Sequence, residues 1–282
     1  MTEIAVRARE LRKQYGHNVA VDNIDLEITH GEIFALLGPN GAGKTTTIEM
    51  LEGHRTRDSG ELSVLGTDPG RAGRSWWDRI GIVTDVTRDS TELTVREAVR
   101  HFAGYYSRPR DPDEVIGRVG LDEKADAKVS QLSRGQRRRL DVALGIVGRP
   151  ALLFLDEPTT GFDPESRQQF WRLIKELAGE GTTILLTTHY LPEAEALADR
   201  VAIIASGKIF AQGTPATLDR RNSGAATVSW DEAGERRSVE TMAASQMVVE
   251  LVDRFGGEVP GLTVARPTLE ETYLHLIGGV KE

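Results

Sequence analysis

The sequence predicts an α/β protein with a parallel-sheet core and a small α+β domain towards its C-terminal end. Three observations support this fold class. Short apolar segments of strand length alternate with segments of helix length between residues 151 and 205. A glycine-rich turn after residue 37 joins a buried strand to a helix. Beyond residue 218 the pattern changes to a hairpin and helical segments. Alternation of strands and helices is typical of a parallel sheet with crossover helices.

The N-terminal region is expected to form strands that lead into and past the glycine-rich turn. Gly16-His17-Asn18 is turn-like and separates two alternating segments. We expect strands at residues 4–9, 19–29, 32–37, 61–65 and 79–83, and a helix at residues 45–51.

From residue 95 to about residue 147 the pattern becomes helical. Val95, Val99 and Phe102 fall on one helical face. Leu140 begins an apolar series at i, i+3, i+4 and i+7 that ends at Val147. Further elements are expected as strand 151–155, helix 164–178, strand 182–188, helix 191–198 and strand 201–205.

The last part of the chain is expected to form a small separate domain. Residues 226–230 and 237–240 alternate around Asp231-Glu232-Ala233-Gly234, which indicates a β-hairpin. Residues 247–255 and 269–277 are expected to be amphipathic helices. We therefore divide the chain into a domain at residues 1–218 and an accessory domain at residues 219–282.

The composition limits the classes of function. The 282 residues include 35 basic and 43 acidic ones, and the net charge of −8 does not favour nucleic acid as a partner. There are no cysteines, so disulfides and thiolate chemistry are excluded. No stretch reaches the roughly 18 apolar residues expected of a spanning helix, and the N-terminus lacks a signal-peptide pattern. A transport function would need a separate membrane protein.

The segment after the strand at residues 32–37 matches the Walker A pattern. Glycines let the backbone approach a phosphate, and the N–H groups at a helix N-terminus then face the anion. Lys44 is expected on the β- and γ-phosphates of ATP, and the Thr45 hydroxyl on Mg²⁺. A purely structural glycine turn is the alternative. The candidate nucleotide-binding residues are Gly38, Pro39, Asn40, Gly41, Ala42, Gly43, Lys44, Thr45 and Thr46.

Two acids follow the apolar strand at residues 151–155, which is a Walker B pattern. Asp156 is expected to hold Mg²⁺ through its water shell. Glu157 is expected to act as the general base for the attacking water. The alternative for Glu157 is an exposed acid at a strand end, but the Walker A lysine favours the catalytic role.

A third motif resembles the signature of the ABC ATPases, just ahead of the Walker B strand. It reads Leu132-Ser133-Arg134-Gly135-Gln136, and Ser133 is a favourable helix N-cap. The resemblance implies a P-loop NTPase fold with a parallel core, an antiparallel β subdomain and a helical subdomain. It also implies that Ser133, Gly135 and Gln136 bind the γ-phosphate held by another subunit. A head-to-tail dimer is therefore expected, with a second copy or with a paralogous ATPase subunit.

Other positions extend the resemblance over about residues 3–218. Gly161-Phe162-Asp163 resembles the D-loop, which touches the opposite subunit. His189 matches the switch histidine that contacts the γ-phosphate and steadies the attacking water. Tyr15 matches an aromatic residue that stacks on adenine, with a strand-packing tyrosine as the alternative. The run Arg137-Arg138-Arg139 is interpreted as a solvated or subunit-facing helix surface.

Two positions depart from the family pattern. Arg134 stands where the signature usually has a second glycine, at a position that varies in the family. Asp85 stands where the family has the Q-loop glutamine. Aspartate can ligate Mg²⁺, but an ionised carboxylate cannot donate a hydrogen bond. We expect Asp85 to keep metal contact and to alter the hydrolysis rate or its coupling to transport, with a degenerate loop as the alternative.

The C-terminal segment narrows the family. Residues 267–274 resemble the closing segment of daunorubicin-resistance-type ATPase subunits, prokaryotic exporters with separate ATPase and membrane chains. The resemblance implies a permease partner and a peripheral position on the cytoplasmic face of the plasma membrane. Two alternatives stay open. One is a soluble ABC ATPase acting in translation or DNA repair, and the other is a regulatory nucleotide-binding module with low turnover.

Overall fold

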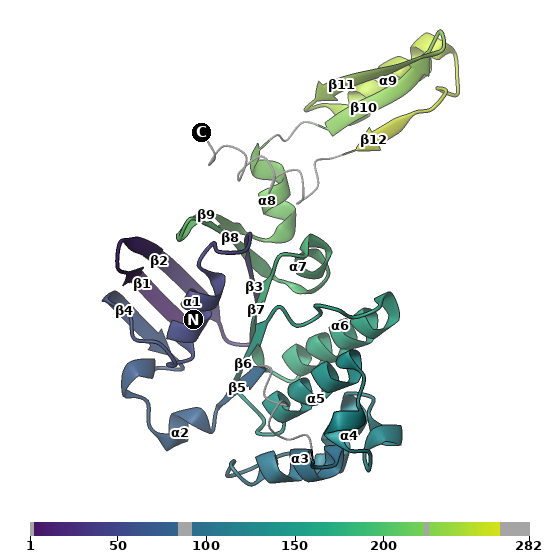
Figure 1. Cartoon of the computed structure of the whole chain (residues 1–282). Coiled ribbons are helices and arrows are strands. Elements are labelled where there is room, and N and C mark those ends of the chain that lie inside the picture. The colour runs from purple at the N-terminus through teal and green to yellow at the C-terminus, as the bar shows by residue number, and fades with distance from the viewer. Residues whose placement is uncertain (1–2, 84–91, 223–225, 266–282) are drawn as a thin grey trace. The chain divides into compact units, whose positions relative to one another are not determined.

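The computed structural model describes residues 3–83, 92–222 and 226–265 (Figure 1). The chain divides into two compact units, Met1–Phe210 and Ala211–Glu282. The first unit holds every candidate site residue. The boundary between the two units lies before residue 219, at which the sequence pattern begins the accessory domain. The limits predicted for the ATPase domain therefore stay a prediction.

A six-stranded sheet forms the centre of the first unit. Its strand order is β5-β6-β7-β3-β8-β9. All pairings from β5 to β8 are parallel, and β3 is buried along its whole length, as in sheets covered on both faces. The strands are β3 (Ile33–Leu37), β5 (Ile80–Val83), β6 (Leu152–Asp156), β7 (Thr183–Thr188), β8 (Arg200–Ala205) and β9 (Lys208–Gly213).

The order of these strands sets the position of the site. β6, β7 and β3 are adjacent and parallel, so their carboxyl ends lie at one edge of the sheet. Ligands of open α/β sheets bind at this edge. The Walker A segment follows β3, Glu157 follows β6 and His189 follows β7, so the topology brings three sequence-distant motifs together.

A three-stranded antiparallel sheet lies beside the central one (Figure 1). Its order is β2-β1-β4, and Tyr15 pairs with Asn18 at the turn between β1 and β2. Helix α1 contacts both β2 and β6 and packs in a core shared by the two sheets. The bounds are β1 (Ile4–Tyr15), β2 (Asn18–Thr29), β4 (Ser59–Val64) and α1 (Lys44–Leu51).

The helical part of the first unit lies between β5 and β6 in the sequence. Helices α3, α4 and α5 contact one another, and α5 also contacts β5 (Figure 1). Helix α7 contacts β3 and β7. The helices are α2 (Arg74–Trp77), α3 (Val95–Ala103), α4 (Pro112–Arg118), α5 (Arg134–Ile146), α6 (Pro164–Gly179) and α7 (Leu191–Leu197).

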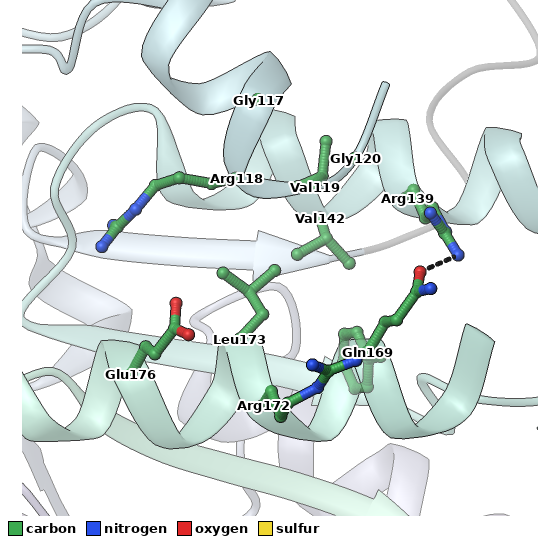
Figure 2. Close-up of a pocket in the computed structure, with 11 residues that line it drawn as sticks. Gly117, Arg118, Val119, Gly120, Arg139, Val142, Gln169, Arg172, Leu173 and Glu176 are labelled. Atoms are coloured by element: carbon green, nitrogen blue, oxygen red, sulfur yellow. Dashed lines mark hydrogen bonds between the residues drawn. The ribbon is translucent and has the colours of Figure 1, made fainter. Parts of the chain in front are cut away.

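A hollow between α4, α5 and α6 is shown in Figure 2. Arg139 on α5 donates to Gln169 Oε1 on α6 at 2.7 Å across one side of it. Arg118 and Glu176 border the other side, and Arg172 lies next to Gln169. None of the residues that line this hollow is a candidate site residue.

The second unit is a small α+β domain. Val228 and Trp230 of the sheet pack against Leu251 of helix α9. Ala233 and Gly234 have φ of 53° and 81°, so the hairpin turn has the tight two-residue form. The elements are α8 (Pro215–Asn222), β10 (Ala226–Glu232), β11 (Glu235–Thr241), α9 (Ala244–Phe255) and β12 (Thr263–Ala265).

The predicted elements within the described residues are present with shifted ends. Four further helices and strands were not predicted, namely α2, β9, α8 and β12. The predicted helix at residues 269–277 lies outside the described residues. Within the described part of the chain, no helix combines the length and the apolar character needed to cross a bilayer.

Candidate functional site

The P-loop (residues 38–46) comprises the loop between β3 and α1 and the first residues of α1. Its shape requires glycine. Gly43 has φ of 104°, in the region that side-chain-bearing residues avoid. A Cβ on Gly43 would lie 2.3 Å from the Ala20 carbonyl oxygen of β2. The backbone there must approach a neighbouring strand closely, and only glycine permits both features.

Lys44 is the buried cation of the P-loop. Its side chain is 5% exposed, and Nζ donates to the carbonyl oxygens of Gly38 at 2.8 Å and Pro39 at 3.2 Å. Nζ also lies 3.6 Å from Glu157 Oε1. All of these partners are oxygen acceptors that hold the ammonium in the loop, and phosphate oxygens can take the same role.

A hollow next to the P-loop has the composition expected of a nucleotide site. The P-loop, Tyr15 from the end of β1 and Glu157 from the end of β6 all border it. Tyr15 is 40% exposed, and Arg55 Cζ lies 5.4 Å from its ring centroid. The residues that line this hollow are Tyr15, Asn18, Val19, Ala20, Asn40, Gly41, Gly43, Lys44, Thr45, Thr46, Glu157, Ser206 and Gly207.

Gly38, Pro39 and Ala42 complete the P-loop without lining the hollow. Gly38 and Ala42 are buried, and Pro39 is half-buried. Their carbonyl groups still shape the loop, because Pro39 accepts from the N–H of Ala42 at 3.2 Å. The N–H groups of the exposed residues 40, 41 and 45 are the ones left nearest to solvent.

The two acids at the end of β6 are held by β7. The Thr187 hydroxyl donates to Asp156 Oδ1. The backbone N–H of Glu157 donates to the carbonyl and the hydroxyl oxygens of Thr187, each at 3.1 Å. Glu157 has φ of 44°, a left-handed conformation that costs a non-glycine residue of order 1–3 kcal/mol. Such strain is found at functional sites because the surrounding structure must enforce it.

His189 follows β7 and faces the same carboxylate. Its Nδ1 lies 3.2 Å from Glu157 Oε1, and its side chain is 52% exposed. Tyr190 N–H donates to the Thr188 hydroxyl at 2.9 Å and fixes the turn that carries the imidazole. One oxygen of Glu157 is therefore bracketed by the Lys44 ammonium and the His189 ring.

A buried acid behind His189 was not singled out from the sequence. Glu193 on α7 is 1% exposed, and burial raises the pKa of its carboxyl. It bonds to the hydroxyls of Thr188 and Thr159, and Trp171 Nε1 donates to it at 3.4 Å. Glu193 joins the turn that bears His189 to the segment after Glu157.

A second buried acid lies beside the P-loop helix. Glu52 follows α1, is 5% exposed, and lies 3.3 Å from His54 Nδ1. Burial, together with the nearby carboxylates of Asp156 and Glu49, raises the pKa of Glu52 to about 7. The α1 periodicity is the sequence signal, since Ile48, Leu51 and residue 52 fall on one buried face.

The signature segment (Leu132-Ser133-Arg134-Gly135-Gln136) opens α5 as predicted. Ser133 caps the helix, because its Oγ accepts from Gln136 N–H at 3.2 Å and its N–H donates to Gln136 Oε1 at 3.0 Å. Ser133 and Arg134 are exposed, and Gly135 and Gln136 are half-buried. Among the described residues that line the P-loop hollow, none comes from the signature segment. Leu132 and Arg134 of the signature segment instead line a separate hollow with Asp156 and Glu157.

The D-loop segment begins α6. Gly161 has φ of 83°, Phe162 is buried against Phe170, and Asp163 caps the helix. Ser166 donates to Asp163 from its N–H at 2.9 Å and its hydroxyl at 2.7 Å, which lowers the pKa of the Asp163 carboxyl. The segment is thereby fixed within its own chain.

The arginine run after the signature bonds inside the chain rather than into solvent. Arg138 donates to the carbonyl oxygens of Asp156 and Pro158, and Arg139 to Ser166 and Gln169. All three arginines of the run are half-buried. These bonds do not fit the solvated form of the predicted surface for Arg138 and Arg139, and the subunit-facing form stays a prediction. Consecutive helical positions point about 100° apart, so three in a row must include an inward one.

Asp85, predicted as a metal ligand, lies outside the described residues, as does the C-terminal segment at residues 267–274. The effect of Asp85 on hydrolysis therefore stays a prediction.

Comparison with known proteins gives consistent results. The model of the ABC transporter family matches residues 21–160. The chain is 35% identical to the daunorubicin resistance ATP-binding protein DrrA3 of Streptomyces coeruleorubidus, covering 99% of this chain and 97% of the relative. It is 39% identical to the Nod factor export ATP-binding protein I of Cupriavidus metallidurans, covering 100% and 93%.

The fold also matches solved structures. One is cbiO1 from Clostridium perfringens, part of the ABC transporter complex cbiONQ. The two chains superpose with a TM-score of 0.69 at 27% identity, over 78% of this chain and 92% of the other.

Proposed function

Because this chain belongs to the ABC transporter ATP-binding family, we propose that it hydrolyses ATP in a head-to-tail dimer that drives a separate membrane subunit of an export system. One observation carries the catalytic part of the proposal. Lys44, Glu157 and His189 follow three adjacent strands, and Lys44 Nζ and His189 Nδ1 converge on Glu157 Oε1.

The residues divide the work of hydrolysis by their chemistry. Backbone N–H groups of residues 40–46 and the Lys44 ammonium bind the phosphates. Glu157 accepts a proton from the water whose oxygen attacks the γ-phosphorus, and the bond to the bridging oxygen of ADP breaks. His189, 3.2 Å from Glu157, holds the carboxylate and contacts the γ-phosphate. Tyr15 stacks on the adenine at the rim.

The donor set fits Mg²⁺. Thr45 and Asp156 offer hard oxygen ligands, which Mg²⁺ prefers. Within the described residues, no group of three or more His, Cys, Asp or Glu side chains is gathered to hold a metal alone. This agrees with a cation that takes its remaining ligands from phosphate oxygens and water. When bound, Mg²⁺ supplies positive charge against the phosphates, and Thr45 and Asp156 are the residues that would hold it.

The signature segment supports the dimer. Ser133 is exposed at the start of a 13-residue helix and lines no part of the P-loop hollow of its own chain. A helix N-terminus attracts anions. A second copy, or a paralogous ATPase subunit, would place this terminus against the γ-phosphate, which completes two composite sites.

An aromatic hollow between β5 and the helical part supports a docking surface for the membrane subunit. Tyr105 is 59% exposed and Trp77 is 37% exposed at this surface. Large aromatic side chains at a groove are suited to receive an amphipathic segment of a partner. The lining residues are Arg74, Trp77, Asp78, Ile80, Ile82, Phe102, Tyr105, Tyr106, Asp141 and Leu144. Docking here would place the chain at the cytoplasmic face of the membrane.

The names of the relatives support a role in export but do not indicate one cargo. The printed names of the two relatives refer to daunorubicin resistance and to Nod factor export. These cargo descriptions differ while both names describe ATP-binding proteins. We therefore assign the ATP chemistry to this chain and the choice of cargo to its membrane partner.

The test is the substitution Glu157→Gln. It removes the base but keeps the size and polarity of the side chain, so ATP should bind and a stable dimer should accumulate. Size-exclusion chromatography with ATP and a phosphate-release assay measure the two effects. Glu235→Gln, an exposed acid of the second unit, is the matched control. A wild-type protein that releases phosphate no faster than E157Q, with or without its membrane partner, would instead indicate the low-turnover binding module.

A further inference from the structure

Arg138 bonds to the backbone on both sides of Glu157. Its Nη2 donates to the Asp156 carbonyl at 2.6 Å, and its Nε donates to the Pro158 carbonyl at 3.2 Å. These two donors lie on one edge of the planar guanidinium, a fork that fixes the direction of both bonds. Arg138 therefore holds the peptide group just before the proposed general base and the peptide group that follows Pro158.

The conformation of Glu157 needs such support. Its φ of 44° is unfavourable for a side-chain-bearing residue. Thr187 of β7 holds its backbone N–H. Arg138 holds the carbonyl before it and the carbonyl after it. With these three attachments the backbone cannot rotate freely about residue 157, and the carboxylate stays between Lys44 and His189.

The neighbouring arginines do not share this task. Arg137 Nη2 donates to the Val129 carbonyl at 3.4 Å, and Arg139 donates to Ser166 and Gln169 of α6. Of the three arginines in the run, Arg138 is the one whose bonds to described residues reach the backbone around Glu157. Arg137 therefore provides a matched control for the loss of a positive charge on α5.

Helix α5 connects this contact to the signature. Ser133 caps the helix, and Arg138 lies about 7.5 Å further along it at 1.5 Å per residue. A helix that is hydrogen-bonded throughout moves as one body over so short a distance. A shift of the signature end therefore reaches the Asp156 and Pro158 carbonyls of the same chain.

We propose that Arg138 is a positioning residue, which sets the orientation of Glu157 and ties it to the signature end of α5. The proposal rests on the proposed role of Glu157 as general base. In a head-to-tail dimer the signature of one subunit contacts nucleotide bound to the other. ATP bound at one composite site would thereby adjust the position of Glu157 at the other composite site. The connection is helix α5 of the subunit that contributes its signature to the first site and its Glu157 to the second.

Kinetic comparison of variants of the full chain tests the proposal. Arg138→Met should lower kcat for ATP hydrolysis about 10- to 100-fold, because a small displacement of the base is costly. KM and the binding of a fluorescent ATP analogue should change by less than about twofold. Arg137→Met, which removes the same charge one position away, should keep kcat within about twofold of wild type. Arg138→Lys should recover part of the loss, since it restores the charge without the two-donor fork.

The variant Glu157→Gln separates positioning from folding. Adding Arg138→Met to Glu157→Gln should lower the residual rate by less than about twofold, because the group that Arg138 orients is already gone. An equal loss in both backgrounds, or equal kcat for R138M and R137M, would overturn the inference. If R138M does not fold, wild-type kcat in R138K would overturn it. A normal rate in E157Q alone would instead overturn the proposed function.

Discussion

Helices α1 and α5 both begin at proposed phosphate-binding segments, yet their first turns differ. The N-cap of α1 is Gly43, which makes no side-chain cap among the described residues. The first residue of α1 is the buried Lys44. The N-cap of α5 is Ser133, in a complete capping box with Gln136, and it is exposed. The first residues of α1 line the P-loop hollow, whereas the Ser133 side chain accepts a hydrogen bond from the Gln136 N–H in the first turn of α5.

This difference shows which half of the site depends on a second chain. The P-loop side is formed within one chain by buried contacts, so nucleotide binding should be a property of the single subunit. The signature side is a capped and exposed helix end, so it needs no ligand for its own stability. Binding and hydrolysis should therefore separate when each end is changed in turn.

The largest effect is expected at the P-loop end. Lys44→Met removes the buried cation, and both nucleotide affinity and hydrolysis should fall, the rate by about 100- to 1,000-fold or more. Fluorescent nucleotide titration and phosphate release measure the two losses. Lys175→Met, an exposed lysine on α6, should leave both unchanged. Unchanged affinity in K44M would show that the hollow at the P-loop is not the binding site.

The next effect is expected at the signature end. Ser133→Arg should keep nucleotide affinity within about twofold but reduce hydrolysis by about 100-fold, because its side chain blocks the facing subunit. Mixing inactive K44M with inactive S133R should restore up to about a quarter of wild-type activity, since half of the dimers are mixed and each has one intact site. A mixture that stays inactive while mixed dimers form would contradict the composite site.

A smaller effect on stability is expected from Glu52, which lies on the P-loop side. Because its folded pKa of about 7 exceeds the ordinary value of 4.5, the folded protein keeps a proton that the unfolded chain loses between these pH values. The free energy of unfolding should therefore fall as pH rises through this window. Glu52→Gln should be more stable than wild type above pH 7, by at most about 3 kcal/mol, with no gain below pH 4.5.

Urea unfolding at several pH values measures this difference. Glu61→Gln, an exposed acid on β4, is the control and should follow wild type at every pH. A stability gain of E52Q that does not depend on pH would show that packing, and not proton binding, causes it.

The smallest effect is expected at the rim of the P-loop hollow. Tyr15→Ala should raise KM for ATP about five- to tenfold through loss of stacking, with little change in kcat. Tyr15→Phe should behave as wild type, since the ring remains. Tyr105→Ala, an exposed aromatic outside the P-loop hollow, should leave KM unchanged. Equal KM values in Y15A and wild type would indicate that Tyr15 only packs on its strand.

The sequence predicts best those parts of the site whose residues are consecutive in the chain. The P-loop residues are consecutive, and the apolar run of β3 and the Asp156-Glu157 pair identify their strands directly. The adjacency of β3, β6 and β7 follows from the parallel class together with the requirement that the three motifs meet. The two strands of the hairpin extend further towards the turn than predicted, because Ala233 adopts a positive φ beside Gly234 and the turn needs only two residues. An alanine in the sequence does not indicate this conformation.

The missed contributions depend on contacts between distant segments. A run of arginines does not state which one faces inward, so the bonds of Arg138 to the end of β6 could not be assigned. Glu52 and Glu193 are acids at apolar positions, and their role depends on Asp156 and Thr188, which only the fold brings near. Helix α8 begins at Pro215 and runs across the domain boundary that the sequence pattern places at residues 218–219.

The Ala20 carbonyl has a consequence for how this protein can diverge. A Cβ on Gly43 would lie 2.3 Å from that oxygen, and one on Gly207 would lie 2.9 Å from it. Gly207 also donates to the Ala42 carbonyl at 2.9 Å. Three segments distant in the sequence thus fit around one atom. Mutations at these positions cannot accumulate independently, and a lineage that replaces Gly207 must first move β2 or lose the shape of its phosphate loop.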